Sequence, residues 1–116
     1  MLSIDVKNFT NDASEVAEPN NARVETVEVG GQTIRRLTLQ PGWKWSQDIK
    51  PLVGTDSCQA HHVGICIEGS LTAIHDDGTE KSYGAGDAYV IAPGHDAWVT
   101  SDTAAVVFEF HAGWGE

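Results

Sequence analysis

The clearest pattern in this chain is an alternation of apolar and polar residues that begins near residue 24. A period of two is typical of β-strands that bury one face, whereas an amphipathic helix repeats every three or four residues. Turn residues interrupt the alternation about every eight to twelve residues, as in all-β sandwiches and barrels. The expected strands span residues 24–29, 33–39, 43–46, 61–67, 71–75, 88–91, 97–100 and 104–111.

The segments between these strands have turn compositions. Residues 30–31 are Gly-Gly and residues 76–78 are Asp-Asp-Gly, and both sequences favour tight β-hairpins. Residues 51–56 are expected to form a loop. Residues 1–22 lack the alternation, so we expect a short N-terminal arm, in which residues 11–18 form one or two helical turns, followed by one domain at 23–116.

The charge balance excludes several classes of partner. Seven basic and seventeen acidic residues give a net charge of −10, which disfavours binding to nucleic acids and to anionic membranes. No apolar run is long enough to span a bilayer, and the N-terminus does not resemble a signal peptide, so we expect a cytoplasmic protein. The two cysteines, Cys58 and Cys66, would lie about 26 Å apart on one strand, too far for a disulfide.

Two short motifs, in order, are similar to the conserved patterns of a known family. Residues 68–71, Glu-Gly-Ser-Leu, match the end of the first cupin pattern, and residues 86–94, from Gly-Asp to Pro-Gly, match the start of the second. The stretch from 41 to 110 therefore resembles the cupins, which are small jelly-roll β-barrels. The resemblance implies a cupin-type jelly roll with an interior pocket for a small-molecule ligand, and a homodimer.

The resemblance also marks where metal ligands would be expected, and this chain differs there. The family's three histidines and one glutamate hold manganese, iron, nickel or zinc. The corresponding positions of the first pattern are Asp56, Cys58 and His62, and the histidine position of the second pattern is Ala97. The usual ligand set is therefore absent.

A different ligand set lies near these positions. Asp56, Cys58 and His62 share strand parity, and His95 could return to the same face across the turn at 93–94. Thiolate, imidazole and carboxylate ligands together suit zinc better than magnesium or calcium. The sequence thus predicts a divalent metal site at these four residues. The alternative is a small buried thiol beside two hydrogen-bonded histidines.

The site depends on the register of the strand at 61–67. One face carries His62, Gly64 and Cys66, and the other carries His61 with three apolar residues, at 63, 65 and 67. We expect the first set to face inward, because the family pattern favours it and Gly64 would leave open volume for a ligand. Two subunits packed together would then cover the apolar outer face.

Four aromatic residues are candidates for binding a ligand. Trp43 and Trp45 lie two apart, so on a strand they would form one aromatic wall. Tyr89 shares parity with Ile91 and could place its hydroxyl in the barrel, and Trp98 would lie at the pocket mouth. For each, packing in the core is the alternative.

These observations leave three functions open. The first is a small-molecule-binding cupin without the usual metal chemistry. The second is a metal-dependent cupin enzyme of isomerase, lyase or dioxygenase type, acting on a small polar metabolite through Cys58, His62 and His95. The third is a redox sensor in which Cys58 is oxidised before Cys66.

Overall fold

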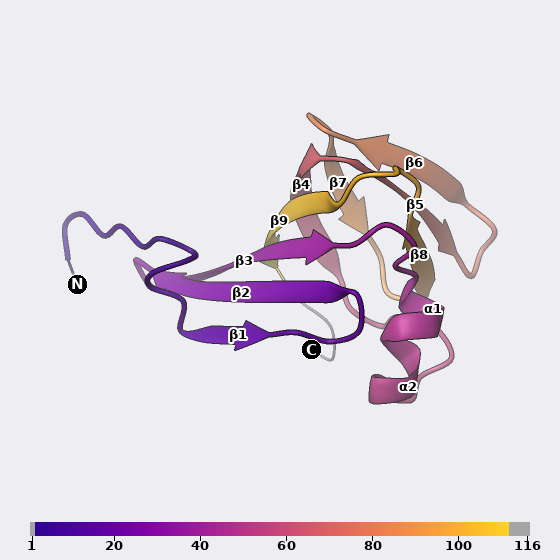
Figure 1. Cartoon of the computed structure of the whole chain (residues 1–116), viewed down its shortest axis with the longest axis horizontal. Helices are drawn as coiled ribbons and strands as arrows, with labels where there is room; N and C mark the ends of the chain where they lie inside the picture. Colours follow the sequence, from indigo (N-terminus) through magenta and orange to yellow (C-terminus); the bar gives the residue numbers. More distant parts are fainter. Residues whose placement is uncertain (1, 112–116) are drawn as a thin grey trace.

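A computed structural model of the chain describes residues 2–111. Its strands form two antiparallel sheets that face each other (Figure 1). The larger has six strands in the order β1-β2-β3-β9-β4-β7, and the smaller has the order β6-β5-β8. The strands are β1 (Glu15–Ala17), β2 (Ala22–Val29), β3 (Gln32–Leu39), β4 (His62–Glu68), β5 (Ser70–His75), β6 (Glu80–Gly84), β7 (Ala88–Ile91), β8 (His95–Val99) and β9 (Ala105–His111).

This arrangement confirms the predicted all-β jelly-roll class and most of the predicted strands. The Gly-Gly turn at 30–31 joins β2 to β3, with Val29 opposite Gln32, and the Asp-Asp-Gly turn joins β5 to β6. The barrel is open along one side, because β6 and β7 are each the last strand of their sheet. No helix among residues 2–111 is long and apolar enough to cross a bilayer.

Three local predictions were wrong. Helical turns do not form within residues 11–18: there Glu15–Ala17 pairs with β2 as strand β1. The expected strand at 43–46 turns into the short helix α1 (Trp45–Asp48). Side chains stabilise this turn, since Asp48 accepts a hydrogen bond from the Lys44 N–H and Asp96 accepts one from the Ser46 N–H, each at 3.0 Å. The loop expected at 51–56 begins with the helix α2 (Lys50–Val53).

The hydrophobic core lies between the two sheets and is closed at one end by the helices (Figure 1). Trp43 and Trp45 are each only 2 % exposed in it, so both tryptophans pack in the core and do not form an open binding surface. The core continues through inward-facing residues of β3, β4, β5, β8 and β9, which are Leu37, Leu39, Cys66, Leu71, Ala97, Val99, Ala105 and Val107.

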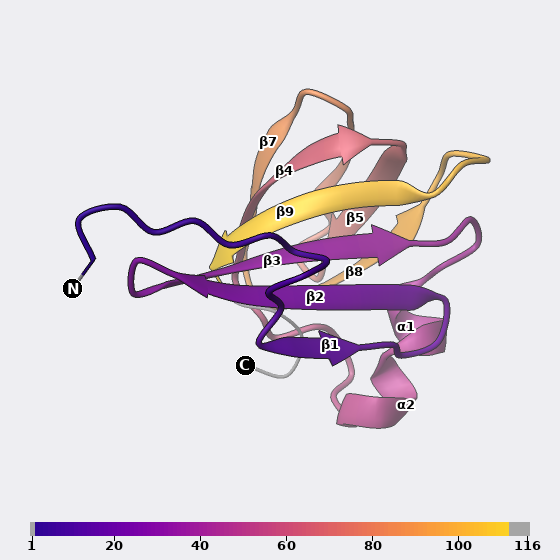
Figure 2. The same ribbon diagram turned by 60° about the vertical axis from the view of Figure 1, so that its left-hand side comes forward.

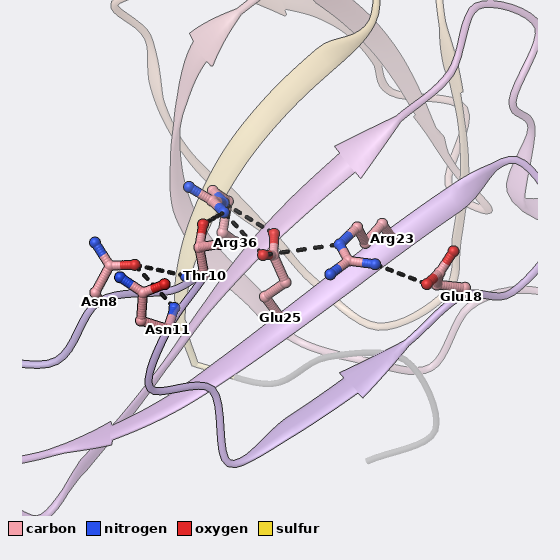
Figure 3. Close-up of polar contacts among 7 residues, drawn as sticks. All are labelled: Asn8, Thr10, Asn11, Glu18, Arg23, Glu25 and Arg36. Carbon is pink, nitrogen blue, oxygen red and sulfur yellow. Dashed lines mark hydrogen bonds and ion pairs between the residues drawn. The ribbon is translucent and has the colours of Figure 1, made fainter.

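A buried ion pair joins β2 to β3 on the outer face of the larger sheet (Figure 3). Arg36 donates hydrogen bonds to both carboxylate oxygens of Glu25, at 3.0 and 2.8 Å, and a third to the Thr10 hydroxyl. The Glu25 side chain is 4 % exposed. The hydrogen bonds from Arg36 lower the pKa of Glu25 more than burial raises it.

This ion pair predicts how stability depends on pH. The folded-state pKa of Glu25 lies below its unfolded value of about 4.3, so the pair stabilises the fold above about pH 5 and less as pH falls through the folded-state pKa. We expect Glu25→Gln to lower the free energy of unfolding by about 1–2 kcal/mol at neutral pH, and this difference from wild type to shrink toward about pH 3. Urea unfolding at several pH values measures it, with the exposed Glu80→Gln as control. A difference that does not change with pH would contradict this account.

Candidate metal centre

Cys58, His62 and His95 come together inside the barrel although they lie on separate segments. Cys58 forms a β-bridge with His95: the Cys58 N–H donates to the His95 carbonyl at 2.7 Å. His62 begins β4, beside this bridge. One donor atom from each of the three residues lies within 4.8 Å of the others, and the three residues are only 3–4 % exposed.

Hydrogen bonds settle which ring nitrogen of each histidine is free. Nδ1 of His95 lies 2.8 Å from the carbonyl oxygen of Ala92, which can only accept, so Nδ1 carries the proton. Nδ1 of His62 lies 2.8 Å from Oε1 of Glu109 and donates to that carboxylate. Both histidines therefore keep Nε2 for a further partner, and Nε2 of His62 lies 3.7 Å from Sγ of Cys58.

The same contacts change the ionisation of the thiol and the imidazole. Burial alone would raise the pKa of Cys58, but hydrogen bonds from His62 and His95 lower it to about 6. Burial alone would lower the pKa of His62, but its contacts with Cys58 and Glu109 raise it to about 9. These contacts favour the thiolate form of Cys58 and the protonated form of His62, and a metal ion would take the place of the proton on Nε2 of His62.

The donor set fits a transition metal ion. In a tetrahedral zinc site, bonds of about 2.0–2.3 Å place the ligand atoms roughly 3.3–3.7 Å apart, so the Cys58–His62 separation already agrees. Each histidine is held through Nδ1 by a carboxylate or a carbonyl, the usual outer contact of a zinc-bound histidine. Three protein ligands with a fourth position open are typical of catalytic zinc.

Beside His62 and His95 lies a cavity of about 30 Å³, which is room for about two water molecules. Trp43, Trp45, Tyr83, Tyr89 and Glu109 contribute to its lining. The space is too small for a sugar or another metabolite of that size. Trp43 and Trp45, which were expected to form an aromatic wall for a ligand, therefore pack in the core next to the candidate metal centre.

A larger space lies outside, on the open side of the barrel between β6 and β7. This cleft has a volume of about 650 Å³, within the range of small-molecule sites. Tyr83, Tyr89 and Ile91 line both the cleft and the inner cavity. The rings of the two tyrosines lie 4.7 Å apart, so this pair separates the cleft from the centre.

The predicted ligand set is only partly assembled. Cys58, His62 and His95 converge, whereas Asp56 is exposed and does not join the group. The predicted strand register is confirmed, since His62 and Cys66 are buried while Ile65 and Ile67 are 38 % and 41 % exposed. Both cysteines are free, as predicted.

Two other expectations about the pocket were wrong. Gly64 leaves no open volume, because a Cβ there would lie 2.8 Å from the Tyr89 hydroxyl and 2.5 Å from the Phe108 carbonyl oxygen. Trp98 is not at the pocket mouth: it alternates with the inward-facing Ala97 and so faces outward, where the Lys44 ammonium lies 5.2 Å from its ring centroid.

Sequence reasoning overlooked Glu109, the carboxylate that holds His62. It is 4 % exposed and also accepts a hydrogen bond from the Tyr89 hydroxyl at 2.7 Å. Burial and the neighbouring Glu109 charge raise the pKa of Tyr89, so its hydroxyl stays protonated. Alternation along β9 places Glu109 on the same face as the core residues Ala105 and Val107, and this parity could have revealed it.

The sequence matches no protein-family profile and no curated protein. Its fold matches the cupin domain of Drosophila melanogaster CENP-C with a TM-score of 0.58, over 84 % of this chain and 70 % of that one, at 10 % identity. This chain has the cupin fold.

Two further structural matches cover nearly the whole chain. A protein of unknown function from Rhizobium leguminosarum gives a TM-score of 0.65 at 17 % identity, over 97 % of this chain and 100 % of that one. The S161A mutant of Bacillus subtilis oxalate decarboxylase gives 0.63 at 15 % identity, over 97 % of this chain but 30 % of the longer enzyme. At such identities the likeness shows the fold, and the function must be argued from the site.

Proposed function

We propose that this cupin binds one divalent metal ion, most favourably zinc, through Cys58, His62 and His95, and that it acts on a small polar metabolite as an isomerase or lyase, or as a dioxygenase where the bound ion is redox-active iron, manganese or nickel. The observation that carries the proposal is the orientation of the two histidines, because both use Nδ1 within the protein and keep Nε2 for a ligand. Such an arrangement beside a buried cysteine is the one that a mixed sulfur and nitrogen site requires.

A bound zinc ion would lower the pKa of a water molecule or polarise a substrate carbonyl. The chain's own groups complete the site. Tyr89 lines both the inner cavity and the cleft, and its hydroxyl donates to the buried Glu109 carboxylate behind His62. Tyr83 and the core tryptophans keep bulk water out. The metabolite would bind in the cleft between β6 and β7 and reach the centre past the tyrosine pair. A reducing cytoplasm would keep the Cys58 thiol available to the metal ion.

Metal analysis of the whole protein tests this proposal. The chain is expressed in medium with zinc, iron, manganese and nickel, purified without chelators, and analysed for bound elements. We expect about one metal ion per chain, and full reloading of the metal-free protein with zinc. Substantially less than one ion per chain under both conditions would exclude the metal-dependent function. The cleft would then support the first prediction, a binding module without metal.

A further inference from the structure

Three residues from neighbouring strands form a row across the inner face of the larger sheet. Gly64 on β4 lies opposite Tyr89 on β7 and opposite Glu109 on β9. Two strand spacings separate Tyr89 from Glu109, roughly 9–10 Å of backbone distance. Because Gly64 has no side chain, the tyrosine reaches across it and donates to Oε2 of Glu109 at 2.7 Å.

From this row we infer that Glu109 is a positioning residue for the metal centre and that Tyr89 holds it in place. The inference rests on the proposed function. Glu109 accepts from His62 through one oxygen and from Tyr89 through the other, so its carboxylate cannot rotate without losing a buried hydrogen bond. This orientation keeps the His62 proton on Nδ1 and turns Nε2 toward Cys58. The free energy of orienting His62 is thus supplied by folding, before any metal binds.

A purely structural role for the network predicts a different result. If the only role of Glu109 and Tyr89 is to form a buried hydrogen bond with each other, replacing either would lower stability. The affinity of the folded protein for metal would stay unaltered. Tyr83 provides a matched control, because it lines the same cavity and contacts the Tyr89 ring.

Zinc affinity of the metal-free protein, measured by competition with a chelating dye, decides between the two. We expect Glu109→Gln to weaken binding about 10–100-fold, Tyr89→Phe to weaken it by a smaller factor, and Tyr83→Phe to leave it within about twofold of wild type. With cobalt, the absorption spectrum of Glu109→Gln should also shift, since His62 is no longer held. Glu109→Asp, which keeps the charge, replaces the glutamine variant if that one does not fold, and we expect weakened binding there too.

The outcomes separate this inference from the proposed function. If wild type binds one zinc ion and both network variants bind it equally tightly, the positioning role is wrong and the metal site stands. If wild type binds no metal, both are wrong.

The outer face of the same sheet carries a second, independent observation. On the adjacent strands β9, β4 and β7, four large apolar side chains are exposed: Ile65 (38 %), Ile67 (41 %), Val90 (68 %) and Phe110 (49 %). The neighbouring part of this face is covered, because the N-terminal segment crosses it there (Figure 2). Phe9 packs on Phe108 with ring centroids 5.2 Å apart, and Arg36 lies over the Phe9 ring.

The N-terminal segment has apolar side chains that its own chain leaves exposed. Leu2, Ile4 and Val6 alternate with polar residues and are 67 %, 81 % and 80 % exposed. Asp5 accepts a hydrogen bond from the Gly30 N–H, which directs this segment toward the β2–β3 hairpin and away from β4 and β7 (Figures 1 and 2). One chain thus presents both an apolar segment and an apolar sheet face that cannot meet within it.

The cupin resemblance already implies a homodimer. We propose that its interface is the exposed face of β9, β4 and β7, with the segment at residues 2–6 of each copy on the outer face of its partner. Such a contact is self-complementary, as a two-fold dimer requires. The four face residues carry no charge, so the net charge of −10 does not directly oppose their burial.

Sedimentation equilibrium of the full chain tests the dimer. We expect a dimer for wild type, a rise of at least about tenfold in the dissociation constant for Val90→Asp and for Ile4→Asp, and no change for Leu52→Asp. Leu52 is 62 % exposed on α2, so it controls for an added surface charge. A monomeric wild type, or a dimer that tolerates both Val90→Asp and Ile4→Asp, would overturn the proposal.

Discussion

Replacement of Cys58 by alanine is expected to weaken zinc binding by about two to three orders of magnitude. Structural zinc sites with four ligands bind with roughly 10–16 kcal/mol in total, which is about 2.5–4 kcal/mol for each ligand. Each 1.4 kcal/mol corresponds to a tenfold change in affinity. Cys58 supplies the one sulfur of the group, so its loss should also remove the sulfur-to-metal absorption band of the cobalt-loaded protein.

The other cysteine is the matched control for this prediction. Cys66 is completely buried, donates to the Glu68 carbonyl at 3.2 Å, and does not belong to the group of metal-ligand candidates. Burial raises the pKa of its thiol, in contrast to the lowered pKa of Cys58. Cys66→Ala should therefore keep wild-type zinc affinity and the cobalt band. Equal losses in the two cysteine variants would show that the metal is bound elsewhere or nonspecifically.

The alternation along the chain predicted most of the strands that pack in the core, but not β6, whose Tyr83 packs against it. Residues 88–91 were predicted as a strand and form β7, and the expected strand at 104–111 differs from β9 by one residue. At residues 43–46 the prediction failed where a distant side chain contributes to the local structure. Trp43 and Trp45 alternate like strand residues, but Asp96 on β8 accepts the Ser46 N–H and favours a helical turn. A local pattern does not contain that contact.

The candidate site was only partly predictable from strand parity. Parity along the expected strand at 61–67 correctly placed His62 and Cys66 on the inner face, whereas Cys58 lies outside β4 and is held there by its bridge to His95. Parity did not fix Asp56, because the chain leaves the sheet before residue 58 and the carboxylate is exposed. Glu109 is 47 residues from His62, and only the pairing of β4 with β9 brings them together. The local alternation of residues does not show which distant strands pair, so the contact between Glu109 and His62 could not be predicted from it.

Gly64→Ala is expected to cause the largest loss of stability among single substitutions in β4, about 2–4 kcal/mol. The new Cβ would lie 2.5 Å from the Phe108 carbonyl oxygen, which is backbone of the paired strand β9 and cannot simply rotate away. Its second contact is the Tyr89 hydroxyl, at 2.8 Å. The melting temperature should fall by about 10 °C or more, as measured by calorimetry of the metal-free protein.

The matched substitution is Gly84→Ala on β6. Neither glycine has a left-handed backbone, so both substitutions test space alone, and at Gly84 the nearest atom would be 3.2 Å from the new Cβ. We expect a cost below about 1 kcal/mol there, because the neighbour must move only a few tenths of an ångström. If both variants lose stability equally, the close approach of the Phe108 carbonyl to Gly64 does not explain the loss. If Gly64→Ala is tolerated but weakens zinc binding, Tyr89 has moved instead of β9. The added methyl group would then have broken the hydrogen bond from Tyr89 to Glu109.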